Sequence, residues 1–112
     1  MHDYSVFCVS DHTGVTVEAV AKSVLAQFPQ LECSLITLPF IDSTDKAQAA
    51  AAHIAAAPAA LVFSSLTDPA LRAPFRHAGL RLFDVFELIA PAIESALGVL
   101  PTRETPIRIR LA

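Results

Sequence analysis

Short apolar stretches with strand character alternate along the chain with longer stretches of helical periodicity. Four stretches are rich in β-branched or aromatic residues and are bounded by polar or turn residues, which predicts strands over residues 4–9, 32–38, 59–64 and 80–85. Segments suited to helices follow each of them, and in the first the apolar residues recur every three or four positions, as on one face of a helix. The pattern therefore predicts a β–α unit repeated four times.

The expected helices are marked by residues suited to their ends. The first should cover residues 14–28 and end at Pro29, and the second should start near Ser43 and run through an alanine-rich stretch to about residue 57. Asp68 followed by proline predicts a capped start for the third helix, which should reach about residue 78 before a left-handed Gly79.

Two prolines complicate this picture. Pro74 falls inside the third helix and predicts a kink or an early break, because proline removes one helical hydrogen bond. Pro91 obscures the start of the fourth helix, which should end near Leu97 and Gly98.

Repeated β–α units predict an α/β domain with a parallel sheet of about four strands and helices on both faces, in three layers. We expect a Rossmann-like or flavodoxin-like fold with the strand order 2-1-3-4 and a single domain over residues 1–100. In that order a ligand crevice should open at the carboxyl ends of the first and third strands. Residues 101–112 carry three of the six arginines and alternate at strand period, so this tail is expected to be an edge strand, a dimer contact or the start of an interdomain linker.

Composition narrows the classes of function. With 54% hydrophobic and 17% charged residues over 112 positions, the chain has the material for a packed core. A net charge of −3 argues against a nucleic-acid surface, and no apolar run reaches membrane-spanning length. The N-terminus does not resemble a signal peptide, so a cytoplasmic protein is expected. The four histidines and two cysteines have no metal-ligand spacing, and both Cys8 and Cys33 are expected to be small buried residues of strands.

The turn after the first strand holds the candidate chemistry. Ser10, Asp11, Thr13, Gly14 and Thr16 surround the start of the first helix. A helix start presents unpaired backbone N–H groups, the hydroxyls add donors, and glycine lets a ligand approach the backbone, so the turn favours a phosphate. Plain capping of the helix is the alternative for the same residues.

At the crevice Asp11 could bind a ribose hydroxyl or a cation or accept a proton, or it could cap the first helix. Ser64, at the end of the third strand, could line the same crevice with Ser65 and Thr67, although an ordinary turn at the strand end explains them as well. Arg72 could reach a phosphate or a partner, and a solvated helix face is the simpler explanation.

Three more side chains lie near the predicted crevice. Glu18 lies where it would balance the helix dipole. Phe40 could stack on a base or belong to the core. His12 could add a titratable contact near the anion site, although a solvent-facing turn residue is the simpler explanation.

Several motifs together resemble one known family. They are Phe7-x-x-Ser10-Asp11-x-Thr13-Gly14-x-Thr16-x-Glu18, Gln27-Phe28-Pro29, Ile36-Thr37-Leu38-Pro39-Phe40, Asp68-Pro69-x-Leu71-Arg72, Phe83-Asp84-Val85 and Ala90-Pro91. Up to about residue 106 the chain resembles the N-terminal part of the bifunctional kinase/pyrophosphorylase that regulates phosphoenolpyruvate synthase and pyruvate, phosphate dikinase. One departure is His12, where that family more often has a small or hydroxyl residue.

The resemblance implies a bacterial regulator and its chemistry. Such proteins phosphorylate a threonine of the target enzyme with ADP and remove the phosphate by phosphorolysis, with release of pyrophosphate. ADP or ATP and phosphate are therefore the implied ligands. The phosphate-binding loop of these proteins, Gly-x-Ser-Arg-x-Gly-Lys-Thr, lies downstream of the matched region and is absent from this sequence. We therefore expect this chain to lack catalytic residues of its own and to be inactive alone.

Three other functions fit parts of the pattern. The turn resembles the flavodoxin loop that grips flavin mononucleotide, which would make the chain a stand-alone phosphate- or nucleotide-binding module. A structural domain that forms a homodimer through its tail is a second alternative. A receiver domain would need an acceptor aspartate where Ser64 and Ser65 stand.

Overall fold

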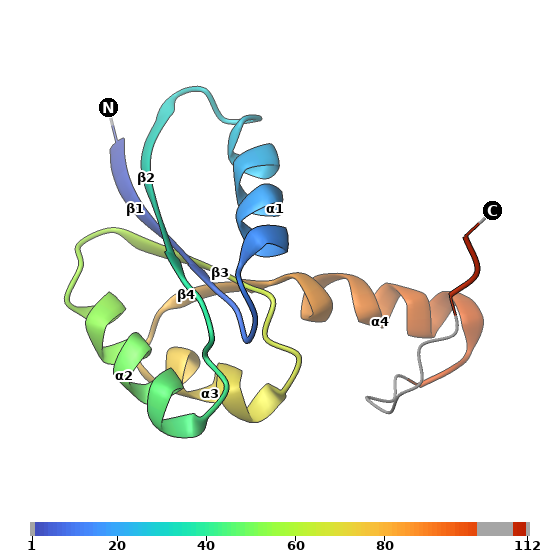
Figure 1. The fold of residues 1–112 in the computed structure, drawn as a ribbon. Coiled ribbons are helices and arrows are strands. Elements are labelled where there is room, and N and C mark those ends of the chain that lie inside the picture. Colours follow the sequence, from blue (N-terminus) through green and yellow to red (C-terminus); the bar gives the residue numbers. More distant parts are fainter. Residues whose placement is uncertain (1, 101–108, 112) are drawn as a thin grey trace.

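The computed structural model describes residues 2–100 and 109–111 of the chain (Figure 1). Strands and helices alternate in the predicted order: β1 (His2–Val9), α1 (Val15–Leu25), β2 (Leu31–Leu38), α2 (Thr44–Ala55), β3 (Ala60–Ser64), α3 (Pro69–His77), β4 (Arg81–Asp84) and α4 (Val85–Leu97). Side-chain caps begin α2 and α3 at Ser43 and Asp68, as predicted, and Gly79 has the expected left-handed conformation with φ of 75°.

The four strands form one parallel sheet in the order β2-β1-β3-β4, which confirms the predicted order. Val9 at the end of β1 lies opposite Leu38 of β2 and Ser64 of β3, and Ser64 lies opposite Asp84 of β4. The carboxyl ends of all four strands are therefore level. The turns that leave the strands meet at one edge of the sheet.

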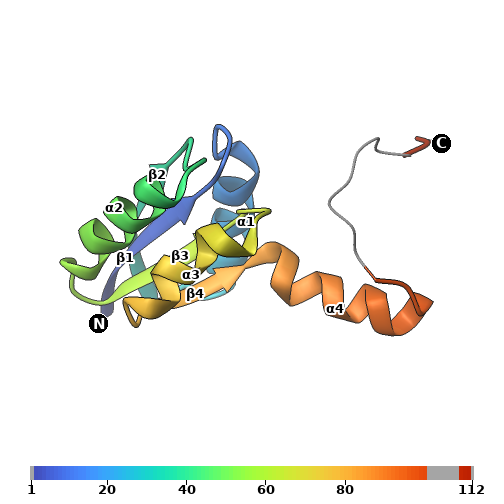
Figure 2. The ribbon, with the colours of Figure 1, turned by 90° about the horizontal axis from the view of Figure 1, so that it is seen from below.

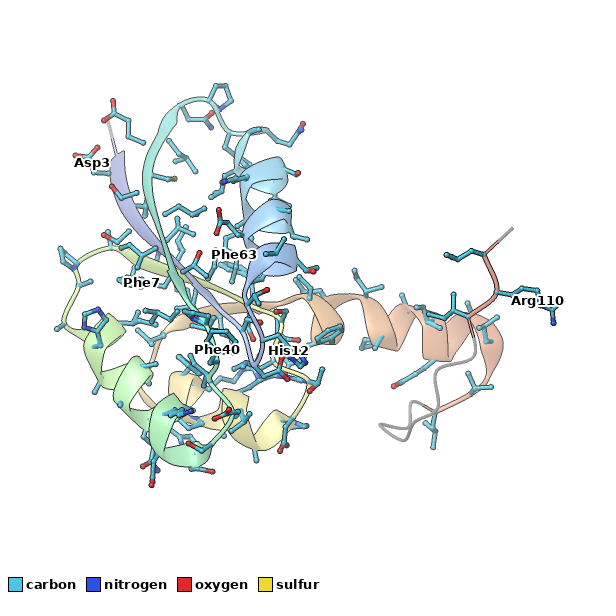
Figure 3. All side chains as sticks on the ribbon, in the orientation of Figure 1. Asp3, Phe7, His12, Phe40, Phe63 and Arg110 are labelled. Carbon is cyan, nitrogen blue, oxygen red and sulfur yellow. The ribbon has the colours of Figure 1, made fainter. Side chains whose placement is uncertain are left out.

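Helices cover both faces of the sheet, so the three-layer α/β fold is confirmed. Figure 1 shows α1 on one side and α2 with α3 on the other. Alternate strand residues supply the two cores, because successive side chains of a strand point to opposite faces. Phe7 packs with residues of α2 and α3, whereas Phe63 packs with Val17 and Ala21 of α1 (Figure 3).

The ends of several elements differ by one to three residues from the sequence prediction, and two of these differences have a clear local cause. Helix α1 ends at Leu25 rather than Phe28, because the N–H groups of Gln27 and Phe28 donate to carbonyls three residues earlier, in a tighter turn than an α-helix. Val85 belongs to α4 rather than to the fourth strand, because the Asp84 carboxylate accepts hydrogen bonds from the backbone N–H groups of Phe86 and Glu87 and starts the helix there.

Neither internal proline ends its helix. Helix α3 continues through Pro74 to His77, so of the two expectations at this proline, a kink or an early break, the early break is wrong. Buried side chains on both sides of this proline, Arg72 and Phe75, hold the helix against the sheet. Pro91 likewise lies inside α4.

Helix α4 projects away from the sheet in two perpendicular views (Figures 1 and 2). None of its residues is buried. Among the described residues, no helix has the length and hydrophobicity needed to cross a membrane. Most of the tail that we expected to be an edge strand, a dimer contact or the start of a linker lies outside the described residues, and residues 109–111 are exposed and not in a strand.

Candidate functional site

A small cleft lies at the carboxyl ends of β1 and β3, where the strand order reverses and where ligands bind in folds of this kind. Its volume is about 160 Å³. The lining comes from the turn after β1, the start of α1, the turn after β3 and the first turn of α4: Ser10, Asp11, His12, Thr13, Gly14, Val15, Thr16, Ser65, Thr67 and Phe86. All five residues that the sequence predicts in the first turn therefore meet in one cleft.

Backbone hydrogen bonds fix the turn after β1. The Ser10 hydroxyl accepts a hydrogen bond from the His12 N–H at 3.0 Å. Two N–H groups that follow β2 also donate to this turn, Phe40 to the His12 carbonyl and Ile41 to the Ser10 carbonyl, both at 2.8 Å. Figure 3 shows Phe40 and His12 at this end of the molecule. The turn is therefore held by its own side chain and by the neighbouring loop.

Gly14 is required at the start of α1 for two reasons. Its φ of 87° lies in the left-handed region, where residues with a Cβ are strained. A Cβ at this position would lie 2.5 Å from the Cγ2 of Thr37 on β2, too close for van der Waals contact. The sequence predicted Gly14 as the place where a ligand approaches the backbone; the structure shows that it also lets α1 approach β2.

The start of α1 carries no side-chain cap, unlike the other three helices. Ser43, Asp68 and Asp84 each accept a hydrogen bond from the first turn of α2, α3 and α4. Among the described residues, no side chain accepts from the first N–H groups of α1, and the helix dipole adds partial positive charge at the same place. An anion in the cleft would supply the missing acceptor.

Asp11 does not cap α1. Its Oδ2 accepts a hydrogen bond from the Thr67 hydroxyl at 2.8 Å and so joins the turn after β1 to the turn after β3. The His12 ring lies 3.8 Å from the other carboxylate oxygen and is 86% exposed, as the sequence predicts for a solvent-facing residue. Thr13 and Thr16 are exposed, and none of the described hydrogen bonds involves their hydroxyls.

Ser64, which the sequence places in the crevice, does not line the cleft. It is fully buried, and its hydroxyl donates to Asp84 Oδ2 at 2.6 Å and accepts from the Leu66 N–H at 3.1 Å. Ser64 therefore has a structural role at the end of β3, where it is bonded to the aspartate that caps α4. The neighbouring Ser65 lines the cleft instead.

Arg72 is buried rather than solvated, so the simpler explanation of this residue is wrong. Its guanidinium donates to the carbonyls of Leu66 and Thr67 at 2.9 and 3.1 Å and to Glu87 Oε1 at 2.7 Å. It also lies 3.4 Å from the Asp84 carboxylate. Arg72 therefore holds the turn that bears Thr67 to the start of α4.

Glu87 completes this network at the surface end. Arg76 donates to both of its carboxylate oxygens and Arg72 to one, and these hydrogen bonds lower the pKa of Glu87 to about 2. Sequence patterns give no signal for this group, because its members lie 11 and 15 residues apart along the chain.

Other candidate residues have structural roles. Glu18 accepts from Thr37 at 2.8 Å and pairs with Lys22, whose hydrogen bond is the largest cause of the lowered pKa of Glu18. Phe40 is 55% exposed and does not line the cleft, so it is neither in the core nor placed to stack on a ligand there.

The two cysteines differ from each other. Cys8 is buried, as predicted, and burial raises the pKa of its thiol to about 11, which removes it as a nucleophile. The prediction was wrong for Cys33, which is exposed. Cys33 lies on β2, which forms one edge of the sheet.

The cleft is chemically suited to one phosphate group. It offers hydroxyls and open N–H groups, with one carboxylate and one imidazole beside them. No lysine or arginine is among the described residues that line it. Its volume is below the roughly 300 Å³ at which pockets for whole organic ligands begin. The described residues also contain no cluster of histidine, cysteine or acidic side chains suited to a metal ion.

Fold and cleft together define an α/β domain with an uncapped helix start in a cleft at the switch point of a parallel sheet. Residues 6–111 match the model of the kinase/pyrophosphorylase family. The chain belongs to that family, which confirms the resemblance described from its motifs.

Several bacterial relatives carry the name "Putative phosphoenolpyruvate synthase regulatory protein". The chain is 69% identical to the one from Thiobacillus denitrificans over 98 residues, which cover 88% of this chain and 38% of the relative. It is 40% identical to those from Bordetella avium and Nitrosomonas europaea, with 85% and 88% of this chain and 36% and 38% of the relatives covered. The chain spans little more than a third of the length of these relatives.

Proposed function

We propose that this chain is the N-terminal domain of a cytoplasmic regulator that acts on phosphoenolpyruvate synthase or pyruvate, phosphate dikinase. The family match and the names of the relatives support this proposal. In one direction the terminal phosphoryl group of ADP passes to a threonine hydroxyl of the target, and AMP leaves. In the other direction inorganic phosphate takes the phosphoryl group from the threonine, and pyrophosphate leaves.

Within that regulator the cleft forms one wall of the nucleotide or phosphate site. The observation that carries this proposal is the uncapped start of α1 inside the cleft. The first N–H groups of the helix and the hydroxyls of Thr13 and Thr16 donate to phosphate oxygens, and Gly14 leaves the backbone accessible. Ser10 holds the turn in shape.

Asp11 and Ser64 act differently from the donors. The Asp11 carboxylate would repel a phosphate and suits a ribose hydroxyl or a cation that accompanies the phosphate. Ser64 stabilises the wall of the cleft indirectly, through its hydrogen bonds to Asp84 and to the Leu66 N–H. Because the described residues that line the cleft include no lysine or arginine, we propose that the positive charge required for phosphoryl transfer comes from another part of the regulator.

The test is a titration of the ¹⁵N-labelled chain with ADP, with inorganic phosphate and with flavin mononucleotide. We expect ADP and phosphate to shift the amides of residues 13–17 in a saturable way. Thr16→Val should weaken the affinity for ADP at least about tenfold, because it removes one hydrogen bond to a charged group. Thr44→Val is the matched control, because Thr44 begins α2, which Ser43 already caps.

The outcomes separate the candidate functions. If ADP shifts only amides elsewhere on the molecule, or if the two variants bind ADP with equal affinity, the cleft is not the ADP site. A yellow complex with flavin mononucleotide at these same amides, with no response to ADP, would favour a stand-alone flavodoxin-like module.

A further inference from the structure

The turns after β1 and β3 each place a buried serine in the lining of the cleft. Ser10 is 3% exposed and Ser65 is 8% exposed. The Ser65 backbone N–H donates to β1, whereas its hydroxyl takes part in no hydrogen bond between described residues. The Ser10 hydroxyl accepts a hydrogen bond from the His12 N–H, and its own proton likewise has no described acceptor. Two hydroxyl donors in the cleft are therefore unused.

The hydroxyl of Ser65 opens onto the cleft. A buried hydroxyl without a partner costs free energy, and in the described part of the chain no enclosed side-chain polar atom lacks one. The Oγ of Ser65 is therefore not enclosed, and the cleft is the opening that this buried residue lines. A ligand with an acceptor atom would complete its hydrogen bonding. This observation is independent of the uncapped start of α1 and indicates the same kind of ligand.

The Asp11 carboxylate adds an acceptor to these donors. Its Oδ2 accepts a hydrogen bond from the Thr67 hydroxyl at 2.8 Å, which fixes the orientation of the group. Its Oδ1 accepts none of the described hydrogen bonds, because the Nε2 of His12 lies 3.8 Å away, beyond hydrogen-bond distance. The cleft thus combines several donors with one carboxylate oxygen that can still accept a proton donor.

This combination suits an anion that carries its own proton. Sulfate has no proton at neutral pH and meets only repulsion at Asp11, whereas the O–H of a hydrogen phosphate can donate to Asp11 Oδ1 in a charge-assisted hydrogen bond. Its other oxygens accept from Ser65 and from the start of α1. We propose that Asp11 and Ser65 set the specificity of the cleft and select inorganic hydrogen phosphate. Because it assigns the ligand of the same cleft, this inference rests on the proposed function.

The charges around the cleft agree with such selection. A lysine or arginine would attract phosphate and sulfate alike, and none is among the described residues that line the cleft. Arg72 lies behind the Thr67 turn, where it donates to the Thr67 carbonyl and pairs with Glu87. Apart from Asp11, the titratable side chain in the described lining is that of His12. Hydrogen-bond geometry, not net charge, therefore distinguishes the two anions here.

Inorganic phosphate suits the cleft better than the terminal phosphate of a nucleotide. Inorganic phosphate keeps at least one proton throughout the neutral range of pH. A phosphate monoester loses its last proton with a pKa of about 6. The terminal phosphate of ADP therefore brings the required proton at pH 6 and has lost it at pH 8.

The test compares phosphate and sulfate as ligands of the ¹⁵N-labelled wild-type chain, followed at the amides of residues 13–17. We expect phosphate to bind at least about tenfold more tightly, the contribution of one hydrogen bond to a charged group. Asp11→Asn should remove this preference, because its amide N–H₂ can donate to either anion. Asp45→Asn makes the same change of charge on α2, outside the cleft, and should retain the preference.

Ser65→Ala distinguishes a ligand-binding role from a structural one. We expect the affinity for phosphate to fall at least about fivefold, while stability in urea does not fall, because the hydroxyl that is removed has no partner in the described structure. Lower stability with unchanged affinity for phosphate would show a structural role and contradict the assignment of Ser65. Ser34→Ala, on β2 and outside the cleft, is the control and should change neither quantity.

ADP distinguishes the two sources of the phosphate group. In His12→Gln, which removes the titratable ring beside Asp11, we expect the affinity for ADP to fall at least about fivefold from pH 6 to pH 8, and that for phosphate to fall less. Equal affinities of the wild type for phosphate and sulfate, a preference that survives Asp11→Asn, or an affinity for ADP that does not change with pH overturns the inference and leaves an unselective anion site. If neither phosphate nor ADP shifts these amides, the proposed function fails as well.

Discussion

The ion pairs of Glu87 predict how the stability of the domain depends on pH. Arg72 and Arg76 donate to the Glu87 carboxylate and lower its pKa from 4.5 to about 2. A carboxyl group whose pKa is lower in the folded than in the unfolded chain adds stability at pH values above its pKa in the unfolded chain. That contribution is complete above about pH 4.5 and disappears as the pH falls toward about 2.

The size of the contribution follows from the same shift. A pKa that falls from 4.5 to about 2 corresponds to about 3 kcal/mol, and this is an upper limit, because Arg76 is 48% exposed and solvent weakens its ion pair. Glu87→Gln keeps the shape of the side chain and removes the charge. We therefore expect the free energy of unfolding at pH 7 to fall by about 1–3 kcal/mol.

The assay is urea unfolding of the wild type and of Glu87→Gln at several values of pH. The two stabilities should differ most above about pH 5 and converge as the pH approaches 2. Glu94→Gln, on the same helix and outside the described ion pairs, is the control and should change stability little. A difference between wild type and Glu87→Gln that stays constant from pH 7 to pH 2.5 would refute the role of the charge.

Three further predictions concern other parts of the molecule. Gly14→Ala should destabilise the fold by at least about 1–2 kcal/mol in urea unfolding, because the left-handed conformation and the 2.5 Å approach to Thr37 both oppose a Cβ; unchanged stability would contradict this reading of the turn. In the native chain Cys33 should react with a thiol reagent at pH 7.5 and Cys8 only after unfolding; rapid reaction of two thiols would show that Cys8 is not protected. The isolated chain should transfer no phosphate from labelled ADP to phosphoenolpyruvate synthase. A labelled target would contradict our proposal that the cleft is only one wall of the nucleotide or phosphate site.

Local sequence patterns were sufficient for the sheet. Alternating strands and helices predict parallel strands, and crossover handedness then limits the orders in which they pair. The caps Ser43 and Asp68 lie beside the helices they start, so short-range rules identify them. The turn from Ser10 to Thr16 was identified for the same reason.

Long-range contacts were not predictable in this way. Arg72 has a polar side chain in a short helix, so periodicity places it in solvent, whereas its partners Asp84 and Glu87 follow 12 and 15 residues later and bury it. The bond between Thr67 and Asp11 spans 56 residues. Phe86 lines the cleft only because Asp84 starts α4 at that point, and no local pattern showed that α4 would leave the sheet.

The most direct test of the central proposal replaces the matched segment of the Thiobacillus denitrificans relative with this chain. Sequence identity of 69% over 98 residues makes the exchange conservative. We predict that the chimera phosphorylates phosphoenolpyruvate synthase with ADP, and that Thr16→Val in the chimera raises the ADP concentration for half-maximal rate at least about tenfold. Thr44→Val should leave it unchanged. A folded chimera without activity, or equal ADP dependence in the two variants, would contradict the proposal that this cleft binds the phosphate.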